Sequence, residues 1–311
     1  MADEYLALKR AKGERSIHDD ELILKRLEAW FGEATPIVDI TAQRIAQYER
    51  DRLSKASARG TPLAAATLNR ELALVRHLLR LAEEWGYLEK VPRIWLGREP
   101  EGRLRFLAEE EIPRLLGAAA ESQNTYFLPI VTIALNTGMR KSEILKLTWD
   151  RVDFSRGVLQ LAETKNGRRR EVPMNRAVYD VLSSMPGAKE EGPVFRRRDG
   201  AAWGDVRTAF EQACKRAKIA DVRFHDLRHT CASWLIMRGR SLKEVQDILG
   251  HREFSMTLRY AHLSPDRLRE AVAALEDFRS PSAQKSAQSG IIDPAPLASP
   301  RKAGVAQWQS N

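Results

Sequence analysis

The amino-acid sequence predicts a mainly α-helical protein with a small antiparallel β-sheet, organised as an N-terminal helical bundle and a larger C-terminal domain. Apolar residues recur at helical spacing along most of the 311 residues, whereas strand-like alternation is confined to residues 157–174. Residues 92–105 contain two prolines, two glycines and four arginines, a composition typical of a linker between domains. A chain of this length also exceeds the usual size of a single domain.

The N-terminal part contains three segments with helical periodicity. They lie at residues 17–32, from Thr41 onward, and at residues 68–86. We expect these helices to pack together as a bundle over residues 17–91. Residues 1–16 show few organising signals and are predicted to form an arm.

In the C-terminal part, helices alternate with one stretch of strands. Helices are expected at residues 107–120, at 126–136, shortly after Arg140, at 176–185 and at 206–218. Strands are expected at residues 157–163 and 170–174, and Asn166-Gly167 between them is the preferred centre of a type I′ hairpin turn. Lys165 should therefore lie at a hairpin tip, where a solvated turn lysine is the alternative interpretation.

The stretch from Arg223 to Pro265 contains polar residues at positions that call for a function. A helix is predicted from Asp226 to Arg238, and a second one follows between the capping box of Ser241 and Glu244 and the stop at Gly250. A further helical piece beginning at Ser255 contains a tyrosine about two turns beyond the second helix. Four side chains are thereby expected to converge on one anion: His225, Arg228, His251 and Tyr260.

Basic residues outnumber acidic ones, 51 against 42, which gives a formal net charge of +9. Part of the excess lies in short runs such as Arg168-Arg169-Arg170. Such runs favour a polyanionic partner, with a solvated basic face as the alternative. The candidates for contact with a phosphate backbone are Arg59, Asn69, Arg70, Arg76, Arg80, Arg168 and Arg169.

Other classes of protein are disfavoured by what the sequence lacks. Cys214 and Cys231 do not have the spacing of zinc ligands, and no cluster of carboxylates suggests a site for two metal ions. No apolar run approaches the ~18 residues of a membrane span, and the N-terminus has no secretion signal. We therefore expect a cytoplasmic protein that needs no metal ion and has no contact with a membrane.

The C-terminal end changes in composition. Ser264-Pro265 should begin a last amphipathic helix, and residues 280–311, rich in Ser, Ala and Pro, are predicted to be disordered. The peptide AGVAQWQSN, residues 303–311, can be back-translated into a sequence that resembles the 5′ part of a transfer-RNA gene. We hypothesise that the reading frame runs into such a gene, and a chance nonapeptide is the alternative.

Four segments occur in the order known from one family: TGMRKSEILKLTWDRVD, ETKNGRRREVPM, FHDLRHTCASWL and DILGHREFSMTLRYAHL. With them the chain resembles the tyrosine recombinases, the phage integrase family. The resemblance implies a SAM-like core-binding domain at 17–91, a linker at 92–105 and a catalytic domain at 106–279. Residues 1–16 are too short for the arm-binding domain of large phage integrases, so either the layout is a simple two-domain one or the start codon is set too late.

The resemblance implies a site-specific DNA recombinase in which Tyr260 attacks a phosphodiester, becomes joined to the 3′-phosphate and releases a 5′-hydroxyl. Two guanidinium groups bind the nonbridging phosphate oxygens in a planar, bidentate manner. By resemblance, the catalytic set is Arg140, Lys165, His225, Arg228, His251 and Tyr260. Lys165 would protonate the leaving oxygen, His225 would accept the tyrosine proton or bind phosphate, and His251 would bind a phosphate oxygen. Glu143 and His229 are expected to support the site, the second in a buried structural role.

The expected partner is double-stranded DNA, bound by a homotetramer on paired sites, and the resemblance also allows for an accessory DNA-bending protein. No cofactor is expected, because exchange through a phosphotyrosine replaces one phosphoester by another. The biological role would be integration or excision of a mobile element. Three alternatives are a type IB topoisomerase-like enzyme that relaxes DNA, a noncatalytic DNA-binding relative, and a helical scaffold protein.

Overall fold

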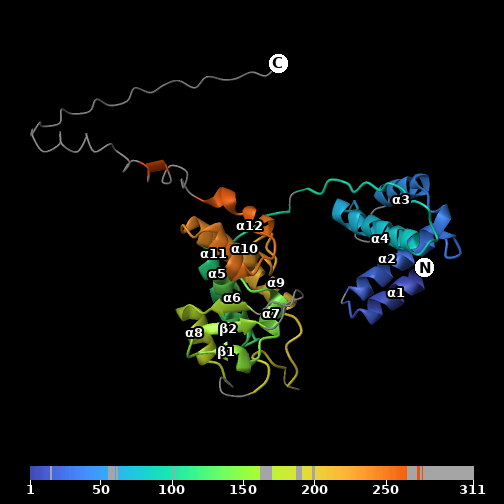
Figure 1. Cartoon of the computed structure of the whole chain (residues 1–311). Coiled ribbons are helices and arrows are strands. Elements are labelled where there is room, and N and C mark those ends of the chain that lie inside the picture. Colours follow the sequence, from blue (N-terminus) through green and yellow to red (C-terminus); the bar gives the residue numbers. More distant parts are fainter. Residues whose placement is uncertain are drawn as a thin grey trace, which may run out of the picture. The chain divides into compact units, whose positions relative to one another are not determined.

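The protein is described from a computed structural model, which is mainly α-helical with one three-stranded antiparallel sheet, as the sequence predicts (Figure 1). The residues described are 1–14, 16–54, 60, 62–100, 102–161, 170–186, 191–197, 200–264, 272–273 and 275. They form two compact units, Met1–Arg103 and Leu104–Asn311. The predictions for residues 280–311, and most of the last helix, lie outside the described residues.

Among its described residues, the N-terminal unit contains four α-helices and one short 3-10 helix, Ile37–Asp39. The α-helices are α1 (Ala2–Ala11), α2 (Ile17–Phe31), α3 (Ala42–Ser54) and α4 (Ala65–Glu84). α1 occupies the stretch for which the sequence predicted an arm with few organising signals. Its Tyr5 is buried in the core of the unit, and the Tyr5 hydroxyl donates a hydrogen bond of 2.7 Å to Asp20 Oδ2 of α2.

A buried carboxylate joins three helices of this unit. Glu71 of α4 is fully buried and accepts hydrogen bonds from Arg52 Nε at 2.9 Å and from the Tyr48 hydroxyl at 2.7 Å, both on α3. Arg26 of α2 adds an ion pair at 2.6 Å. Burial alone would raise the pKa of Glu71, but the hydrogen bonds from Arg52 and Tyr48 outweigh burial and lower it.

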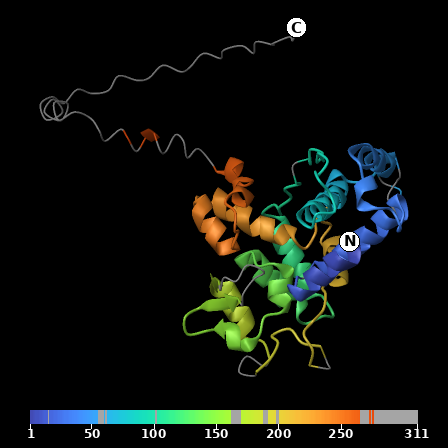
Figure 2. The ribbon, with the colours of Figure 1, turned by 45° about the vertical axis from the view of Figure 1, so that its right-hand side comes forward.

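The C-terminal unit contains eight α-helices among its described residues. They are α5 (Glu111–Ala120), α6 (Phe127–Thr137), α7 (Lys141–Leu145), α8 (Arg176–Ser183), α9 (Arg207–Arg216), α10 (Asp226–Met237), α11 (Leu242–Leu249) and α12 (Ser255–Leu258). α6 lies in the middle and packs against α5, α7, α8 and α10. Figures 1 and 2 show α10, α11 and α12 together toward one end of the unit.

The sheet has the strand order β1 (Val152–Asp153), β2 (Val158–Leu161), β3 (Arg170–Pro173). β2 and β3 pair antiparallel with Leu161 opposite Arg170, which confirms the two paired strands predicted from alternation. β1 was not predicted, because two residues are too few to show alternation. The predicted turn with Lys165 lies outside the described residues.

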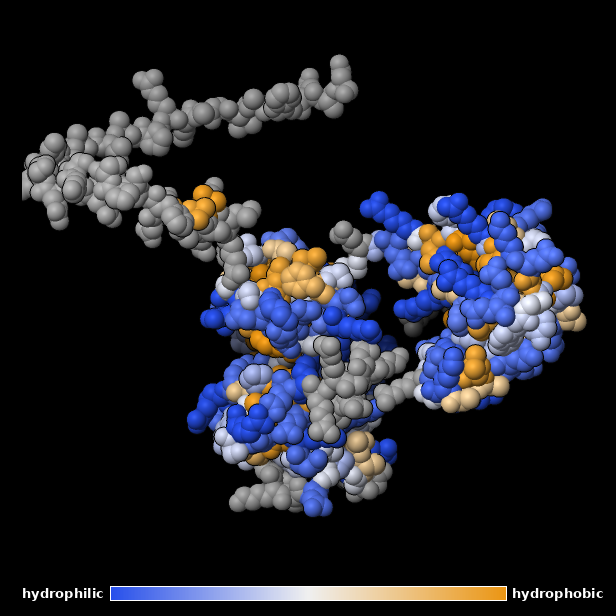
Figure 3. Space-filling model, viewed as in Figure 1, coloured by the Kyte–Doolittle hydropathy of each residue, from blue (hydrophilic) through white to orange (hydrophobic). Residues whose placement is uncertain are grey.

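On the face seen in Figure 3, the described residues of both units are mainly hydrophilic, and hydrophobic residues appear in separate patches. Among the described residues, no helix combines the length and the apolar composition that crossing a membrane requires.

Glu71 gives a test of the N-terminal unit. Glu71→Gln removes the buried anionic partner of Arg52 and Arg26. We therefore expect it to reduce the free energy of local unfolding by about 2–4 kcal/mol. Native-state hydrogen exchange of amides in α2, α3 and α4 measures this loss. Glu84→Gln, at an exposed position of the same helix, is the matched control. Equal exchange in the two variants would contradict the role of the Glu71 network.

Candidate active site

The candidate site is built around a buried arginine. Arg228 lies in the first turn of α10 with 3% of its surface exposed. Its Nη1 donates to the carbonyl of Gly138 at 2.6 Å and its Nη2 donates to the carbonyl of Leu249 at 2.9 Å. These carbonyls lie at the C-terminal ends of α6 and α11, where the helix dipole favours a cation. Burial, together with the nearby Arg140 and Arg170, lowers the pKa of Arg228 to about 10, so the group remains charged at neutral pH.

Local sequence chemistry places those two carbonyls. Gly138 ends α6 with a φ of +60°, and a Cβ at this position would meet Leu249 and Cys231. Gly250 ends α11 with a φ of +65°. Ser241 and Glu244 form the predicted capping box at the start of α11. The two glycine stops therefore direct the ends of two helices toward one guanidinium group.

Arg140 lies at the N-terminus of α7, and a carboxylate holds it there. Its backbone N–H and its Nη1 donate to the two oxygens of Glu143, at 2.8 Å and 2.7 Å. The Arg140 side chain is 37% exposed, so its guanidinium can reach a ligand from solvent.

A third arginine, Arg170, completes the cationic group, and the sequence did not predict it as a site residue. Its side chain is mostly buried, with Nη1 donating to the Leu249 carbonyl and Nη2 donating to Glu143 at 3.3 Å. Its buried Nε has no hydrogen-bond partner among the described residues. Burial lowers the pKa of Arg170 despite the opposing effect of Glu143. Arg170 is both the last residue of the basic run and the first residue of β3, and its place at the start of a strand was the available signal.

Two histidines one turn apart on α10 have different surroundings. His225 is exposed at the N-cap of the helix, and His229 is buried. Their rings meet edge to face with centroids 5.0 Å apart. Burial lowers the pKa of both, that of His229 to about 4, so His229 is neutral at pH 7.

Tyr260 follows α12 and is 1% exposed. Its hydroxyl lies 2.6 Å from Nδ1 of His229, and its ring belongs to a small core with residues of α10 and α11, among them Ala232 and Leu249. Burial raises the pKa of Tyr260 to about 12, so the phenol is protonated at neutral pH.

The other histidine of the predicted set lies just after α11. The Nδ1 of His251 is 2.9 Å from the Thr257 hydroxyl, and the ring is buried. Burial, with Arg228 and Arg140 nearby, lowers the pKa of His251 to about 3. The structure thus brings together five of the six predicted catalytic side chains, and Lys165 lies outside the described residues.

The predicted DNA-contact residues are placed unevenly. Arg70 and Arg80 are exposed on α4, whereas the Asn69 side chain is bound to the backbone of Gly97 on both sides, at 2.8 Å and 2.9 Å. Arg76 donates to the Ile94 carbonyl at 2.7 Å. Asn69 and Arg76 therefore hold the segment after α4 in place, and their contact with DNA stays a prediction. Arg59, Arg168 and Arg169 lie outside the described residues.

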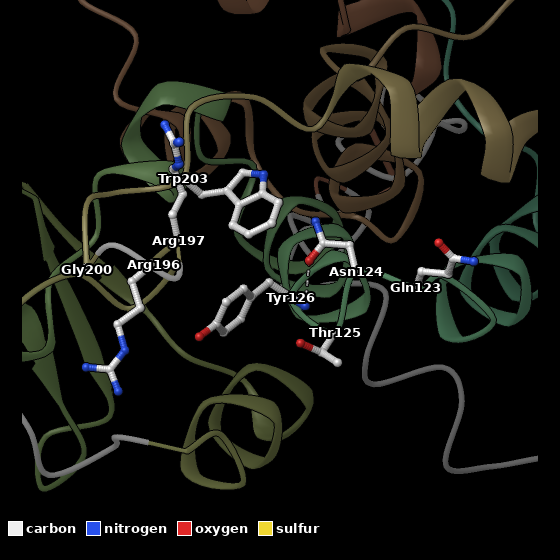
Figure 4. Close-up of a pocket in the computed structure, with 8 residues that line it drawn as sticks. All are labelled: Gln123, Asn124, Thr125, Tyr126, Arg196, Arg197, Gly200 and Trp203. Atoms are coloured by element: carbon white, nitrogen blue, oxygen red, sulfur yellow. Dashed lines mark hydrogen bonds between the residues drawn. The ribbon is translucent and has the colours of Figure 1, made fainter.

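A separate open hollow of about 720 Å³ lies at the start of α6, and Figure 4 shows its lining. Tyr126 and Trp203 meet there edge to face with ring centroids 6.0 Å apart, and Arg196 and Arg197 contribute to the wall. α6 separates this hollow from Gly138 by ~16 Å of helix. None of the predicted catalytic residues lines it. Among the described residues, no three His, Cys, Asp or Glu side chains are grouped so that they could hold a metal ion.

Comparison with known proteins fits this geometry. The model of the phage integrase family matches residues 105–267, the part of the chain that contains the site. The chain belongs to the phage integrase family. Among curated members, it is 37% identical over 263 residues to a shufflon-specific DNA recombinase of Escherichia coli, covering 83% of this chain and 66% of the relative. It is 34% identical to the integrase of Salmonella phage P22, covering 70% of this chain and 59% of that integrase.

Other family members extend the comparison. The integrase of Haemophilus phage HP1 is 33% identical, with 80% of this chain and 72% of that protein covered. The fold is similar to that of the Tn1549 transposon integrase in complex with a circular intermediate DNA, with a TM-score of 0.72 at 20% identity over 88% of this chain and 98% of that one. A λ integrase dimer bound to a core site gives a TM-score of 0.67 at 19% identity, over 83% and 93% of the two chains. The chain spans less than two thirds of the length of the shufflon recombinase and of the P22 integrase.

The contact between Gly250 and Arg170 can be tested with two glycines. A Cβ at Gly250 would overlap the Arg170 guanidinium, whereas a Cβ at Gly239, also at positive φ, would meet nothing within 4 Å. Gly239→Ala should cost about 1–2 kcal/mol from backbone strain alone. Gly250→Ala should cost more, because it also displaces Arg170 from the Leu249 carbonyl. Urea denaturation measures both, and equal losses would show that the Arg170 contact adds nothing.

Proposed function

We propose that this phage integrase family member is a site-specific DNA recombinase that cuts and rejoins DNA through a 3′-phosphotyrosine at Tyr260. The observation that supports this most is the pairing of a tyrosine with a group of arginines whose charge exceeds that of the acidic groups around them. The three guanidinium groups share one carboxylate and two helix carbonyls. Glu143 contacts Arg140 and Arg170, and the two carbonyls accept hydrogen bonds from Arg228. A phosphodiester brings the negative charge that this arrangement favours.

The two arginines of the predicted set have complementary positions for phosphate binding. Arg228 is fixed by two carbonyls and keeps N–H donors beyond those bonds, and Arg140 is partly exposed while Glu143 fixes its orientation. A scissile phosphate bound by both groups would have its nonbridging oxygens neutralised before the reaction begins. Charge that develops on those oxygens in the transition state is then stabilised without reorganisation.

The chemical step exchanges one phosphoester for another. The Tyr260 oxygen attacks phosphorus, the bond to the 5′-oxygen breaks, and Lys165 donates a proton to that leaving oxygen. His225 binds phosphate or accepts the tyrosine proton, and His251 orients a phosphate oxygen. The phosphotyrosine ester retains the energy of the phosphoester bond that was broken. The 5′-hydroxyl of another strand can therefore reverse the step without a nucleotide cofactor.

The partner in this proposal is double-stranded DNA, and the chain acts as a homotetramer on paired sites, with an accessory DNA-bending protein as a further partner. Arg70 and Arg80 on α4, and Arg59, Arg168 and Arg169, contribute phosphate contacts. The role is integration or excision of a mobile element in the bacterial cytoplasm or nucleoid. The DNA complexes of the Tn1549 and λ integrases, which have a similar fold, motivate this part of the proposal.

The nucleophile is tested by Tyr260→Phe. We expect this variant to bind DNA as the wild type does and to form no covalent protein–DNA adduct, because the attacking oxygen is absent. Adducts are measured by denaturing electrophoresis with labelled DNA that contains the element's end sequence. Tyr179→Phe, at an exposed position of α8, is the control and should form adduct normally. An undiminished adduct with Tyr260→Phe would reject the assignment.

The general acid is tested by Lys165→Ala. Cleavage of ordinary DNA should slow by about 10²–10⁴-fold, the usual contribution of a positioned proton donor. A substrate with sulfur in place of the bridging 5′-oxygen has a leaving group that needs little protonation, so it should restore cleavage. If the sulfur substrate is cleaved as slowly as ordinary DNA, Lys165 is not the acid.

A further inference from the structure

The hydroxyl of Tyr260 has a specific partner that the sequence did not assign to it. Nδ1 of His229 lies 2.6 Å from the phenolic oxygen, and the two rings are tilted by 49° with centroids 5.9 Å apart. Among the described residues, His229 is the one side chain that hydrogen-bonds with this hydroxyl. His225, the neighbouring histidine one turn earlier, is exposed at the N-cap of α10.

The direction of this hydrogen bond depends on which nitrogen of His229 carries the proton. Burial raises the pKa of Tyr260 to about 12 and lowers that of His229 to about 4, so both groups are neutral at pH 7. A neutral phenol donates its proton, and Nδ1 accepts it only when the imidazole proton is on Nε2. In this tautomer the resting geometry is that of a proton donor already aligned with an unprotonated ring nitrogen.

We propose that His229 is the catalytic residue that accepts the Tyr260 proton, which leaves His225 to bind phosphate. This inference rests on the proposed function. As the Tyr260 oxygen forms its bond to phosphorus, the phenolic proton moves to Nδ1 of His229 and the bond to the 5′-oxygen breaks. When a 5′-hydroxyl later attacks the phosphotyrosine, His229 returns the proton to the departing phenol. Atoms and charge balance in both directions.

The charged groups around the pair link this proton transfer to DNA binding. His225, Asp226 and Arg228 face His229 from α10, and Arg259 faces it from the chain just before Tyr260. With two arginines against one carboxylate, an imidazolium at position 229 is disfavoured in the free protein. A phosphate bound by Arg228 adds negative charge beside the ring and makes the imidazole more basic. His229 thus becomes an effective base when the substrate is in place.

The test compares His229→Asn with His262→Asn in the full chain. An asparagine places its amide oxygen where Nδ1 was, so it keeps a hydrogen-bond acceptor for the phenol but cannot take up the proton. His262 is exposed two residues after Tyr260, and its substitution makes the same chemical change at a position with no part in the proposed proton transfer. The measurement is single-turnover adduct formation on nicked DNA of the element's end sequence, from pH 7 to pH 9.

At pH 7, His229→Asn should form adduct about 100-fold more slowly than the wild type, with unchanged DNA binding. Its rate should then rise by about tenfold per pH unit, because the phenolate fraction of a group with a pKa of about 12 rises by that factor. The wild type and His262→Asn should stay nearly flat, since His229 is neutral throughout this range. Such a profile supports proton acceptance by His229, because a purely structural role would not respond to pH in this way.

Three results would overturn the inference. Faster adduct formation by His229→Asn would show that His229 locks the tyrosine away, and a slow rate that does not rise with pH would show a structural role. An unchanged rate would place the base elsewhere, while wild-type adduct formation keeps the proposed function intact. Absence of adduct in the wild type would instead reject the proposed function itself.

A measurement on the wild type covers the case in which the variant does not fold. Nitrogen-15 NMR of the labelled histidines distinguishes a protonated ring nitrogen from a bare one. The proposal requires His229 as the Nε2–H tautomer with a hydrogen-bonded, unprotonated Nδ1. A proton on Nδ1 of His229 would make it a donor toward Tyr260 and would overturn the inference.

Discussion

A positive charge enclosed by protein is the constraint on which the C-terminal unit depends. Arg228 is removed from water, and two helix-end carbonyls serve as its hydrogen-bond partners. Isolated charges in such places are costly, and here two more guanidinium groups lie near the first. The fold tolerates this because Glu143 and the C-terminal ends of α6 and α11 offset part of the charge. The remainder is an excess of positive charge in the site, which the proposed function assigns to binding of a phosphate.

The tyrosine adds a second constraint, because in this structure it is enclosed too. Its ring completes the small core between α10 and α11, and its hydroxyl is hydrogen-bonded to His229. A phenol in that position is protected from solvent and held close to the arginine group at the same time. In the proposed reaction, a phosphate enters the arginine group and meets the Tyr260 oxygen. The residues around the hydroxyl and the arginine group lie on or next to α10, α11 and α12, together with the end of α6 and the starts of α7 and β3.

The sequence predicted the features that are determined by residues close together in the chain. The start and the end of α11 follow from Ser241, Glu244 and Gly250, which act within a few residues, and the structure has both as predicted. The pairing of β2 with β3 follows from alternation around a turn. The role of Arg170 depends on a hydrogen bond to the carbonyl of Leu249, 79 positions away in the chain. The contact of His229 with Tyr260 likewise joins residues 31 positions apart. No periodicity encodes such contacts. The four motif segments indicated the family, but they could not show which histidine touches the phenol.

The central claim is that Tyr260 becomes covalently joined to a DNA strand. The most direct measurement is mass spectrometry of the peptide that remains attached to DNA after a trapped cleavage reaction, with sequencing of the DNA end. A recombinase that acts through Tyr260 gives the peptide that contains Tyr260, linked through a 3′-phosphate, and a free 5′-hydroxyl on the other strand end. A linkage through any other residue, or to a 5′-phosphate, would contradict this claim.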